Sequence, residues 1–144
     1  MNKITGCTIL SFLFCIVARS QSTIILEVTN LKSDNGVCRA CLFNNQASYE
    51  GKTSKPFQCI SGLIKAQNAK MKFSNISSGT YAIFVYHDAN NNNKMDRNFI
   101  GIPKEGYGAS KNNLPYASAP AFNENKFTID NKTQVILPVR IRNL

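Results

Sequence analysis

The sequence has no apolar run long enough to cross a lipid bilayer as a helix. Its one sustained run, residues 8–17, holds about ten residues, whereas a membrane-spanning helix needs about 20. This run follows the basic residue Lys3 and precedes Ala18-Arg19-Ser20, which is the pattern of a secretory signal peptide. We therefore expect residues 1–20 to be a cleaved signal peptide. Residues 21–144 should form a single soluble domain that is secreted or periplasmic.

Cysteine and histidine are too few for an ordinary zinc site. Two of the five cysteines fall in the expected signal peptide, and Leu13-Phe14-Cys15 lacks the small residues that precede a lipidated cysteine, so a lipoprotein is not favoured. Cys38, Cys41 and Cys59 remain, with His87 as the only histidine, and four zinc ligands are hard to assemble from them. Cys38 and Cys41 are three residues apart in an expected strand, where residues at that spacing point to opposite faces. We expect Cys38 to be a small core residue, and a disulfide, if one forms, to join Cys59 to either Cys38 or Cys41.

Nucleic-acid binding is not favoured, although the chain is basic. It carries 17 Lys and Arg residues against 8 Asp and Glu residues, a formal net charge of +9. The basic residues lie one or two at a time, and no aromatic residues alternate with them, which is typical of solvated strand faces. Weak attraction to anionic polysaccharide or lipid surfaces is compatible with this charge.

Apolar residues at every second position predict an all-β domain. Ile24, Leu26 and Val28 show this period, which is that of a strand with one face inward. Several such segments joined by turns, with no convincing helix, indicate an antiparallel immunoglobulin-like or transthyretin-like β-sandwich of about seven strands. The expected strands span residues 23–29, 37–43, 57–65, 69–76, 80–87, 122–129 and 133–141.

Local signals suggest how these strands are arranged. Asn35-Gly36 readily accepts positive φ, so we expect the first two strands to form a hairpin. Residues 80–87 are apolar on both faces and should form a central strand. Pro138 cannot donate to a ladder, so the last strand should lie at an edge or carry a bulge. Residues 88–120 have no sustained periodicity, and loops of roughly thirty residues inside a domain are usually functional.

This long loop begins with HDANNNNKMD, residues 87–96, whose spacing resembles that of a calcium loop. Counted from Asp88, side-chain oxygens stand at positions 1, 3, 5 and 9. Position 6, usually glycine, is Asn93, and position 12, usually glutamate, is Phe99. With so little charge we expect a weak site, with a dissociation constant of about 10⁻⁴ to 10⁻³ M. The candidate ligands are Asp88, Asn90, Asn92, Lys94 through its carbonyl, Asp96 and, if it folds back, Glu105.

The alternative to a calcium site is a metal-free turn. Asparagine side chains can satisfy nearby backbone groups themselves, as they do in Asx turns. The sequence leaves both interpretations open.

Two classes of function are compatible with these residues. A binding or structural module could present aromatic faces to a glycan or a cell-envelope protein. A hydrolase-like enzyme could use His87 with nearby acidic residues. However, His87 and Asp88 are neighbours at the end of an expected strand, and neighbours on a strand point to opposite faces. The sequence also has no nucleophile elbow and no phosphate-binding glycine loop. We therefore favour the binding or structural module and assign no catalytic residue. The candidate ligand-binding residues are His87, Tyr107, Tyr116 and Phe122.

The segment around the loop also resembles a known family. Gly79 to Ile83, Val85 to Asn90 and above all His87 to Ser110 resemble uncharacterised exported bacterial proteins grouped as domain of unknown function 2141. The likeness covers nearly the whole mature chain. In that family the loop commonly reads H-D-x-N-x-N-G-x-x-D, with glycine where this chain has Asn93. The resemblance implies a secreted or periplasmic β-sandwich from a bacterium of the Bacteroidetes type, and no known activity.

Overall fold

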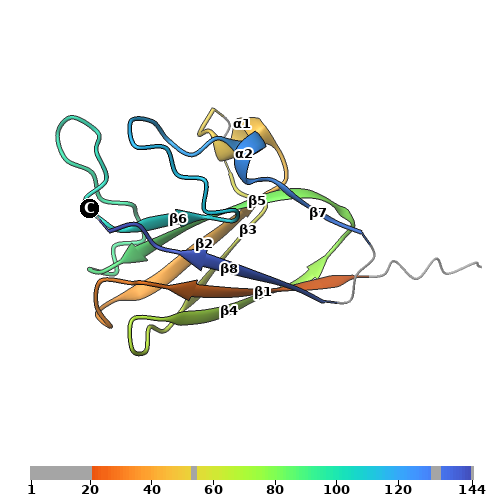
Figure 1. Ribbon diagram of the computed structural model, residues 1–144, viewed down its shortest axis with the longest axis horizontal. Coiled ribbons are helices and arrows are strands. Elements are labelled where there is room, and N and C mark those ends of the chain that lie inside the picture. Colours follow the sequence, from red (N-terminus) through yellow and green to blue (C-terminus); the bar gives the residue numbers. More distant parts are fainter. Residues whose placement is uncertain (1–20, 53–54, 131–133, 144) are drawn as a thin grey trace, which may run out of the picture.

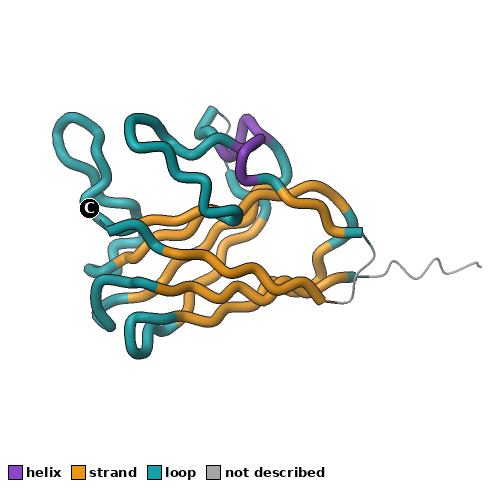
Figure 2. The backbone as a smooth tube through the Cα atoms, viewed as in Figure 1, coloured by secondary structure: helices purple, strands orange, loops and turns teal. Residues whose placement is uncertain are grey.

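A computed structural model describes residues 21–52, 55–130 and 134–143, so the expected signal peptide lies outside the described residues. These residues form two facing β-sheets, with two short helices beside one of them (Figure 1; Figure 2). The predicted β-sandwich is thereby confirmed. In chain order the elements are β1 (Ser22–Thr29), β2 (Val37–Phe43), α1 (Gln46–Tyr49), β3 (Gln58–Gly62), β4 (Ala69–Ile76), β5 (Gly79–Asp88), β6 (Tyr107–Ala109), α2 (Phe122–Asn125), β7 (Phe127–Ile129) and β8 (Gln134–Arg140).

The strand order places β5 inside one sheet and β8 at the edge of the other. The first sheet has the order β4-β1-β8, and the second has the order β3-β2-β5-β6, with β7 pairing the start of β5. The pairs are antiparallel except for β1 and β8, which run parallel. Both expectations for these strands are confirmed. Pro138 lies on the edge strand, where a residue without an amide hydrogen is tolerated.

The predicted hairpin between the first two strands is wrong. β1 pairs with β4 and β8, whereas β2 pairs with β3 and β5, so the two strands belong to different sheets. Leu31, in the connection that crosses between the sheets, is only 1% exposed. Gly36 does adopt a positive φ, of +72°. A turn signal fixes the local backbone, however, and not the strand with which the returning chain pairs.

Two segments beyond residue 100 also differ from the expected assignment. Residues 122–129 form α2 and then β7 instead of one strand, because the buried Asn125 side chain donates to the Ala121 carbonyl at 3.1 Å and closes a turn. Within the expected loop, β6 adds an eighth strand that pairs with β5. A strand of three residues is too short to leave a periodic signal in the sequence.

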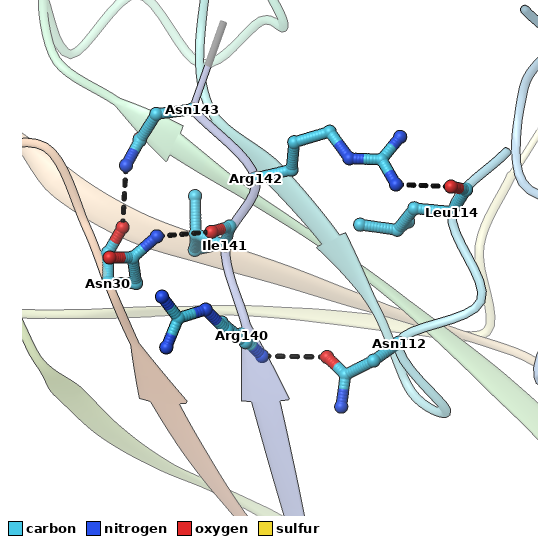
Figure 3. Close-up of a pocket in the computed structure, with 7 residues that line it drawn as sticks. All are labelled: Asn30, Asn112, Leu114, Arg140, Ile141, Arg142 and Asn143. Atoms are coloured by element: carbon cyan, nitrogen blue, oxygen red, sulfur yellow. Dashed lines mark hydrogen bonds between the residues drawn. The ribbon is translucent and has the colours of Figure 1, made fainter. Parts of the chain in front are cut away.

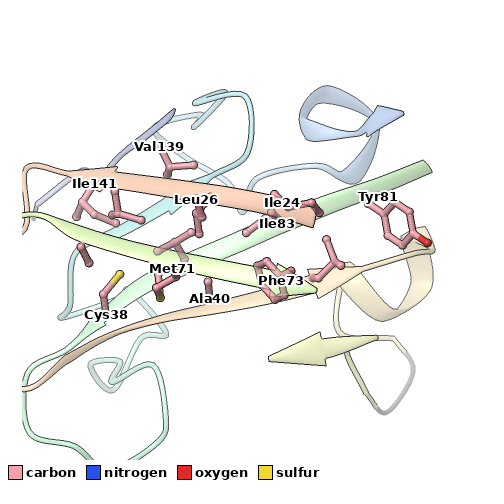
Figure 4. Packing of buried hydrophobic residues seen from close by; sticks show 14 of the residues in the cluster. Ile24, Leu26, Cys38, Ala40, Met71, Phe73, Tyr81, Ile83, Val139 and Ile141 are labelled. Atoms are coloured by element: carbon pink, nitrogen blue, oxygen red, sulfur yellow. The ribbon is translucent and has the colours of Figure 1, made fainter. Parts of the chain in front are cut away.

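The core lies between the two sheets and is built from the inward positions of their strands (Figure 4). On β4, Met71 and Phe73 are buried whereas Lys70 and Lys72 are exposed, so the predicted alternation is confirmed. Each fully buried aliphatic or aromatic side chain stabilises the fold by about 1.5–3 kcal/mol. The side chains that meet across the core include Ile24, Leu26, Cys38, Ala40, Met71, Phe73 and Ile83.

The cysteines obey the same alternation. Cys41 and Cys59 are directly opposite each other on β2 and β3 and form a disulfide. Cys38, three residues before Cys41, faces the core and forms no disulfide among the residues that the structure describes. Burial raises the pKa of its thiol to about 12, so it stays protonated at neutral pH. Of the two pairings that the sequence left open, the structure contains the one with Cys41.

Candidate functional site

Asp88, the last residue of β5, has its carboxylate enclosed by hydrogen-bond donors. The residue is fully buried. Its Oδ2 accepts from Arg39 Nε at 2.5 Å and from the Asn93 amide at 3.0 Å, and its Oδ1 accepts from the Asn92 amide at 3.0 Å. Arg39 comes from the neighbouring strand β2 and also donates to Ser61 Oγ of β3 at 2.9 Å. The carboxylate therefore joins the second sheet to the loop that follows it.

These donors determine the ionisation of Asp88. Burial of the carboxylate acts to raise its pKa, but the Arg39 guanidinium and the amides of Asn93 and Asn92 favour the charged form more strongly. The pKa of Asp88 is therefore lower than that of an ordinary aspartate. A group whose pKa is lowered in the folded state stabilises the fold above its unfolded pKa. It loses that contribution as the pH falls through the folded value.

Beyond Asp88, two asparagine side chains converge on one carboxylate. Asn90 Nδ2 lies 2.7 Å from Asp96 Oδ2, and Asn92 Nδ2 lies 2.8 Å from Asp96 Oδ1. The side-chain oxygen of Asn90 accepts from the Asn92 amide at 3.2 Å, and that of Asn92 accepts from the Lys94 amide at 2.8 Å. The asparagines therefore satisfy backbone groups of their own segment, as in Asx turns.

The other two asparagines supply the sharp bends of this segment. Asn91 and Asn93 adopt the left-handed conformation, with φ of +58° and +65°. Asparagine tolerates positive φ better than most other residues that carry a Cβ. Asn93 thus takes, at position 6 of the loop, the conformation that glycine usually supplies.

Glu105 closes the loop from its far end. It is only 8% exposed, and its two carboxylate oxygens accept from the Ala89 amide at 3.0 Å and the Asp96 amide at 3.1 Å. The Lys104 amide donates to the Asp96 carbonyl at 2.8 Å. Glu105 does fold back onto the loop, and it does so by binding backbone amides. The start and the return of the loop are therefore fastened to each other.

The expected metal ligands are only partly brought together. In residues 21–52, 55–130 and 134–143, no group of three or more His, Cys, Asp and Glu side chains is arranged to hold a metal ion. The carboxylates of Asp88 and Glu105 are occupied by backbone amides and Arg39. The part of the set that converges near solvent is Asp96 with Asn90 and Asn92.

His87 is not paired with the neighbouring aspartate. It is 3% exposed, and its Nε2 lies 2.8 Å from the Asn35 carbonyl. The carboxylate of Asp88 is directed to Arg39 and the loop amides instead. His87 therefore links β5 to the connection before β2. The acid-base pair that a hydrolase would need is not assembled from these two residues.

The four candidate ligand-binding residues do not form one site. His87 is buried, and so are Tyr107 and Phe122, each 7% exposed. The Tyr107 ring stacks on Phe84 with centroids 5.9 Å apart, and Phe122 contacts another ring edge to face. Tyr116, by contrast, is 97% exposed, with an arginine guanidinium carbon 4.7 Å from the centre of its ring. Of these four residues, only Tyr116 offers an aromatic surface to solvent.

Comparison with known proteins identifies the family of this chain. The bacterial family described as "Uncharacterized protein conserved in bacteria (DUF2141)" matches residues 26–136, which include most strands and the whole loop. The chain belongs to the DUF2141 family. No curated protein and no solved structure matches it. The resemblance noted from the residues around the loop is thereby confirmed.

None of the helices that the structure describes in this DUF2141 protein is long and apolar enough to cross a membrane.

Two residues that support the loop were not identified from the sequence. Gly36 packs so closely on the loop base that a Cβ there would lie 2.0 Å from the Asp88 carbonyl oxygen and 2.7 Å from Ala89 Cα. Arg39 supplies the cation beside Asp88. A charged residue in the otherwise apolar strand VCRACLF was the available signal, since a partly buried cation usually has an acidic partner. No sequence signal indicated which acid it would meet.

A shallow pocket near the end of β8 proves to be a junction between chain segments (Figure 3). The side chain of Asn30 donates to the Ile141 carbonyl at 2.8 Å, and the Asn112 side chain accepts from the Arg140 amide at 2.7 Å. Arg142 donates to the carbonyls of two residues in the segment after β6. These contacts fasten the C-terminal segment to its neighbours, so most of the polar lining is already bound to protein.

Replacing Asp88 with asparagine is expected to lower the free energy of unfolding at neutral pH by on the order of 3 kcal/mol. The change removes the charged partner of Arg39 and weakens an acceptor of two loop amides. The wild type should also lose stability as the pH falls below about 4, the ordinary range of aspartate, and Asp88→Asn should lose less. Urea denaturation at a series of pH values measures both effects. Glu124→Gln, at an exposed carboxylate, is the control, and equal curves for Asp88→Asn and wild type would contradict the assignment.

Gly36→Ala tests the contact between the two connections at the loop base. Both Gly36 and Gly51 have positive φ, of +72° and +70°, but only at Gly36 does a Cβ meet backbone atoms, since nothing lies within 4 Å of it at Gly51. Gly51→Ala should therefore cost about 1 kcal/mol for the backbone conformation alone, and Gly36→Ala clearly more, above about 2 kcal/mol. The two midpoints of urea denaturation give the comparison. Equal losses would show that the close approach has no energetic weight.

Proposed function

We propose that this DUF2141 protein is an exported binding or structural module whose loop, residues 88–96, binds calcium weakly. The observation that carries the proposal is the convergence of Asn90 and Asn92 on Asp96 at 2.7 and 2.8 Å. Three oxygen-bearing side chains meet there beside solvent, on a loop whose backbone is already fixed by Asp88 and Glu105. To hold a cation, both asparagine amides would have to turn their oxygens away from the Asn92 and Lys94 backbone amides and toward the ion, and this reorganisation is a further reason for weak affinity.

The chemistry of these side chains suits a hard cation. Calcium takes six to eight oxygen ligands, and the side-chain carbonyl of asparagine is one of the neutral oxygens that it accepts. Asp96, which is partly exposed, would supply the charge, and Asn90, Asn92 and the carbonyl of Lys94 would supply neutral oxygens. Asp88 already carries the Arg39 cation, so it contributes mainly by shaping the loop. A site with one uncompensated carboxylate belongs to the weak class, around 10⁻⁴ to 10⁻³ M.

Export is supported by the disulfide between Cys41 and Cys59. Disulfides persist in oxidising compartments and are rare in the cytosol. The bridge lies between two strands of the second sheet, where it fastens β3 to β2. Together with the signal-peptide pattern of residues 1–20, it favours a secreted or periplasmic location.

A partner such as a glycan or a cell-envelope protein could stack on Tyr116, which is exposed on the segment between β6 and α2. Its ring is backed by the Arg142 guanidinium, which leaves the other face free for stacking. Tyr116→Ala should then abolish binding to a panel of envelope glycans while leaving the unfolding midpoint unchanged. Glycan binding that is unaffected by this change would exclude Tyr116 as the contact.

The calcium site is tested by thermal unfolding of protein isolated from the periplasmic or extracellular fraction. At about 5 mM calcium, a dissociation constant near 10⁻⁴ M predicts roughly 2.3 kcal/mol of added stability, or several degrees in the midpoint. Asp96→Asn should remove the shift, and Glu124→Gln should keep it. A midpoint that is equal in calcium and in EDTA would refute the calcium site, and protein found only in the cytoplasm would refute export.

A further inference from the structure

The tip of the same loop is unusually apolar for an exposed segment. Phe99 is 99% exposed, Ile100 is 64% exposed and Ile102 is 49% exposed. Isolated apolar residues on a surface are ordinary, but here three large ones lie within four positions on one protruding turn. The segment between β5 and β6 extends away from the end of the sandwich (Figure 1; Figure 2). The apolar side chains are thus held where another surface can reach them.

The backbone of this tip is already hydrogen-bonded internally. The Asn98 side-chain oxygen accepts from the amides of Ile100 and Ile102 at 3.1 and 2.9 Å. The Asn98 amide donates to the Ile102 carbonyl at 2.8 Å, and the Gly101 amide donates to the Asn98 carbonyl at 3.0 Å. Polar backbone groups that lack partners are the main cost of entering an apolar phase. In this tip, four amides have their partners before any contact is made.

Basic residues flank the apolar tip in the sequence. Between residues 97 and 104 the sequence has two cations, Arg97 and Lys104, and no acidic residue. Both are exposed, and Arg97 donates to the Gly101 carbonyl at 2.9 Å, which keeps its guanidinium beside the turn. Lys94, also exposed, precedes them. We call Arg97, Lys104 and Lys94 the basic collar of the tip. An apolar tip with such a collar is complementary to a lipid bilayer that has an anionic headgroup layer over an apolar interior.

We propose that residues 97–104 form a membrane-docking loop that inserts Phe99 and Ile100 into the interface of an anionic lipid bilayer, with Arg97, Lys104 and Lys94 at the headgroups. A convex tip suits a bilayer, which yields to it, better than a protein partner, which would need a matching groove. The inference goes beyond the proposed function, because neither the apolar side chains nor the basic collar requires calcium.

The absence of tryptophan from the chain allows a direct test. Phe99→Trp places the only indole at the tip, and Ile136→Trp places it on β8, where Ile136 is 55% exposed. Both proteins are mixed, in EDTA, with vesicles of phosphatidylcholine containing about one third phosphatidylglycerol. The emission of Phe99→Trp should shift to shorter wavelength and become shielded from acrylamide, and that of Ile136→Trp should not change.

Cosedimentation with the same vesicles gives the size of the effect. Phe99→Ser should weaken partitioning about tenfold or more, and Lys104→Gln about fivefold, whereas Ile136→Thr should bind as the wild type does. Binding should also fall with added salt and on pure phosphatidylcholine. The variants lie at exposed positions, and urea denaturation checks that they fold normally.

An emission spectrum of Phe99→Trp that vesicles do not change, or wild-type partitioning of Phe99→Ser, would overturn the membrane assignment. An unchanged emission spectrum would instead favour an apolar groove on a protein partner as the surface that the tip contacts. Because every arm is run in EDTA, the outcome is independent of the calcium site. Failure of the membrane proposal can therefore be distinguished from failure of calcium binding.

Discussion

The buried carboxylate of Asp88 is the contact on which the loop depends. It lies at the end of the central strand of the second sheet, and a charged group can be buried there only because Arg39 and two backbone amides surround it. Arg39 in turn comes from the adjacent strand and also contacts the next one. The loop is therefore fixed to three strands of the sheet through one side chain. At the other end of the loop, the Glu105 carboxylate likewise accepts hydrogen bonds from two backbone amides of the loop.

The sequence predicted the layers of the fold well and their connections poorly. The alternation of Met71 and Phe73 with lysines determines which face is buried, because solvation decides it residue by residue. The pairing of β1 depends instead on which strands are available at its two edges. β4 pairs with one edge of β1, and β8, which follows β1 by more than a hundred residues, pairs with the other. The Asn35-Gly36 turn could not indicate either pairing. Whether a segment forms a strand can be predicted from its local sequence, whereas the order of strands in a sheet cannot.

The loop was located from its residue types, but their roles were only partly predictable. Asn90, Asn92 and Asp96 do come together, as alternating residues in a tight turn suggest. The Asp88 carboxylate instead binds Arg39 and two loop amides. Which carboxylate would face solvent depends on Arg39, which lies 49 positions earlier in the chain. The burial of Tyr107 was similarly hidden, because it follows from the short strand β6 pairing with β5. Contacts of this kind are set by tertiary structure and leave no trace in local spacing.

The two halves of the loop have different physical roles. In residues 88–96, asparagines and aspartates provide acceptors and left-handed bends, so that a segment without regular structure is nonetheless fixed. In residues 97–104, Asn98 does the same for the turn, and the side chains are then free to be apolar. An exposed phenylalanine on a mobile chain would collapse onto the nearest apolar surface of its own domain. On a turn held by its own hydrogen bonds it stays extended, and its apolar area remains available for a contact outside the molecule.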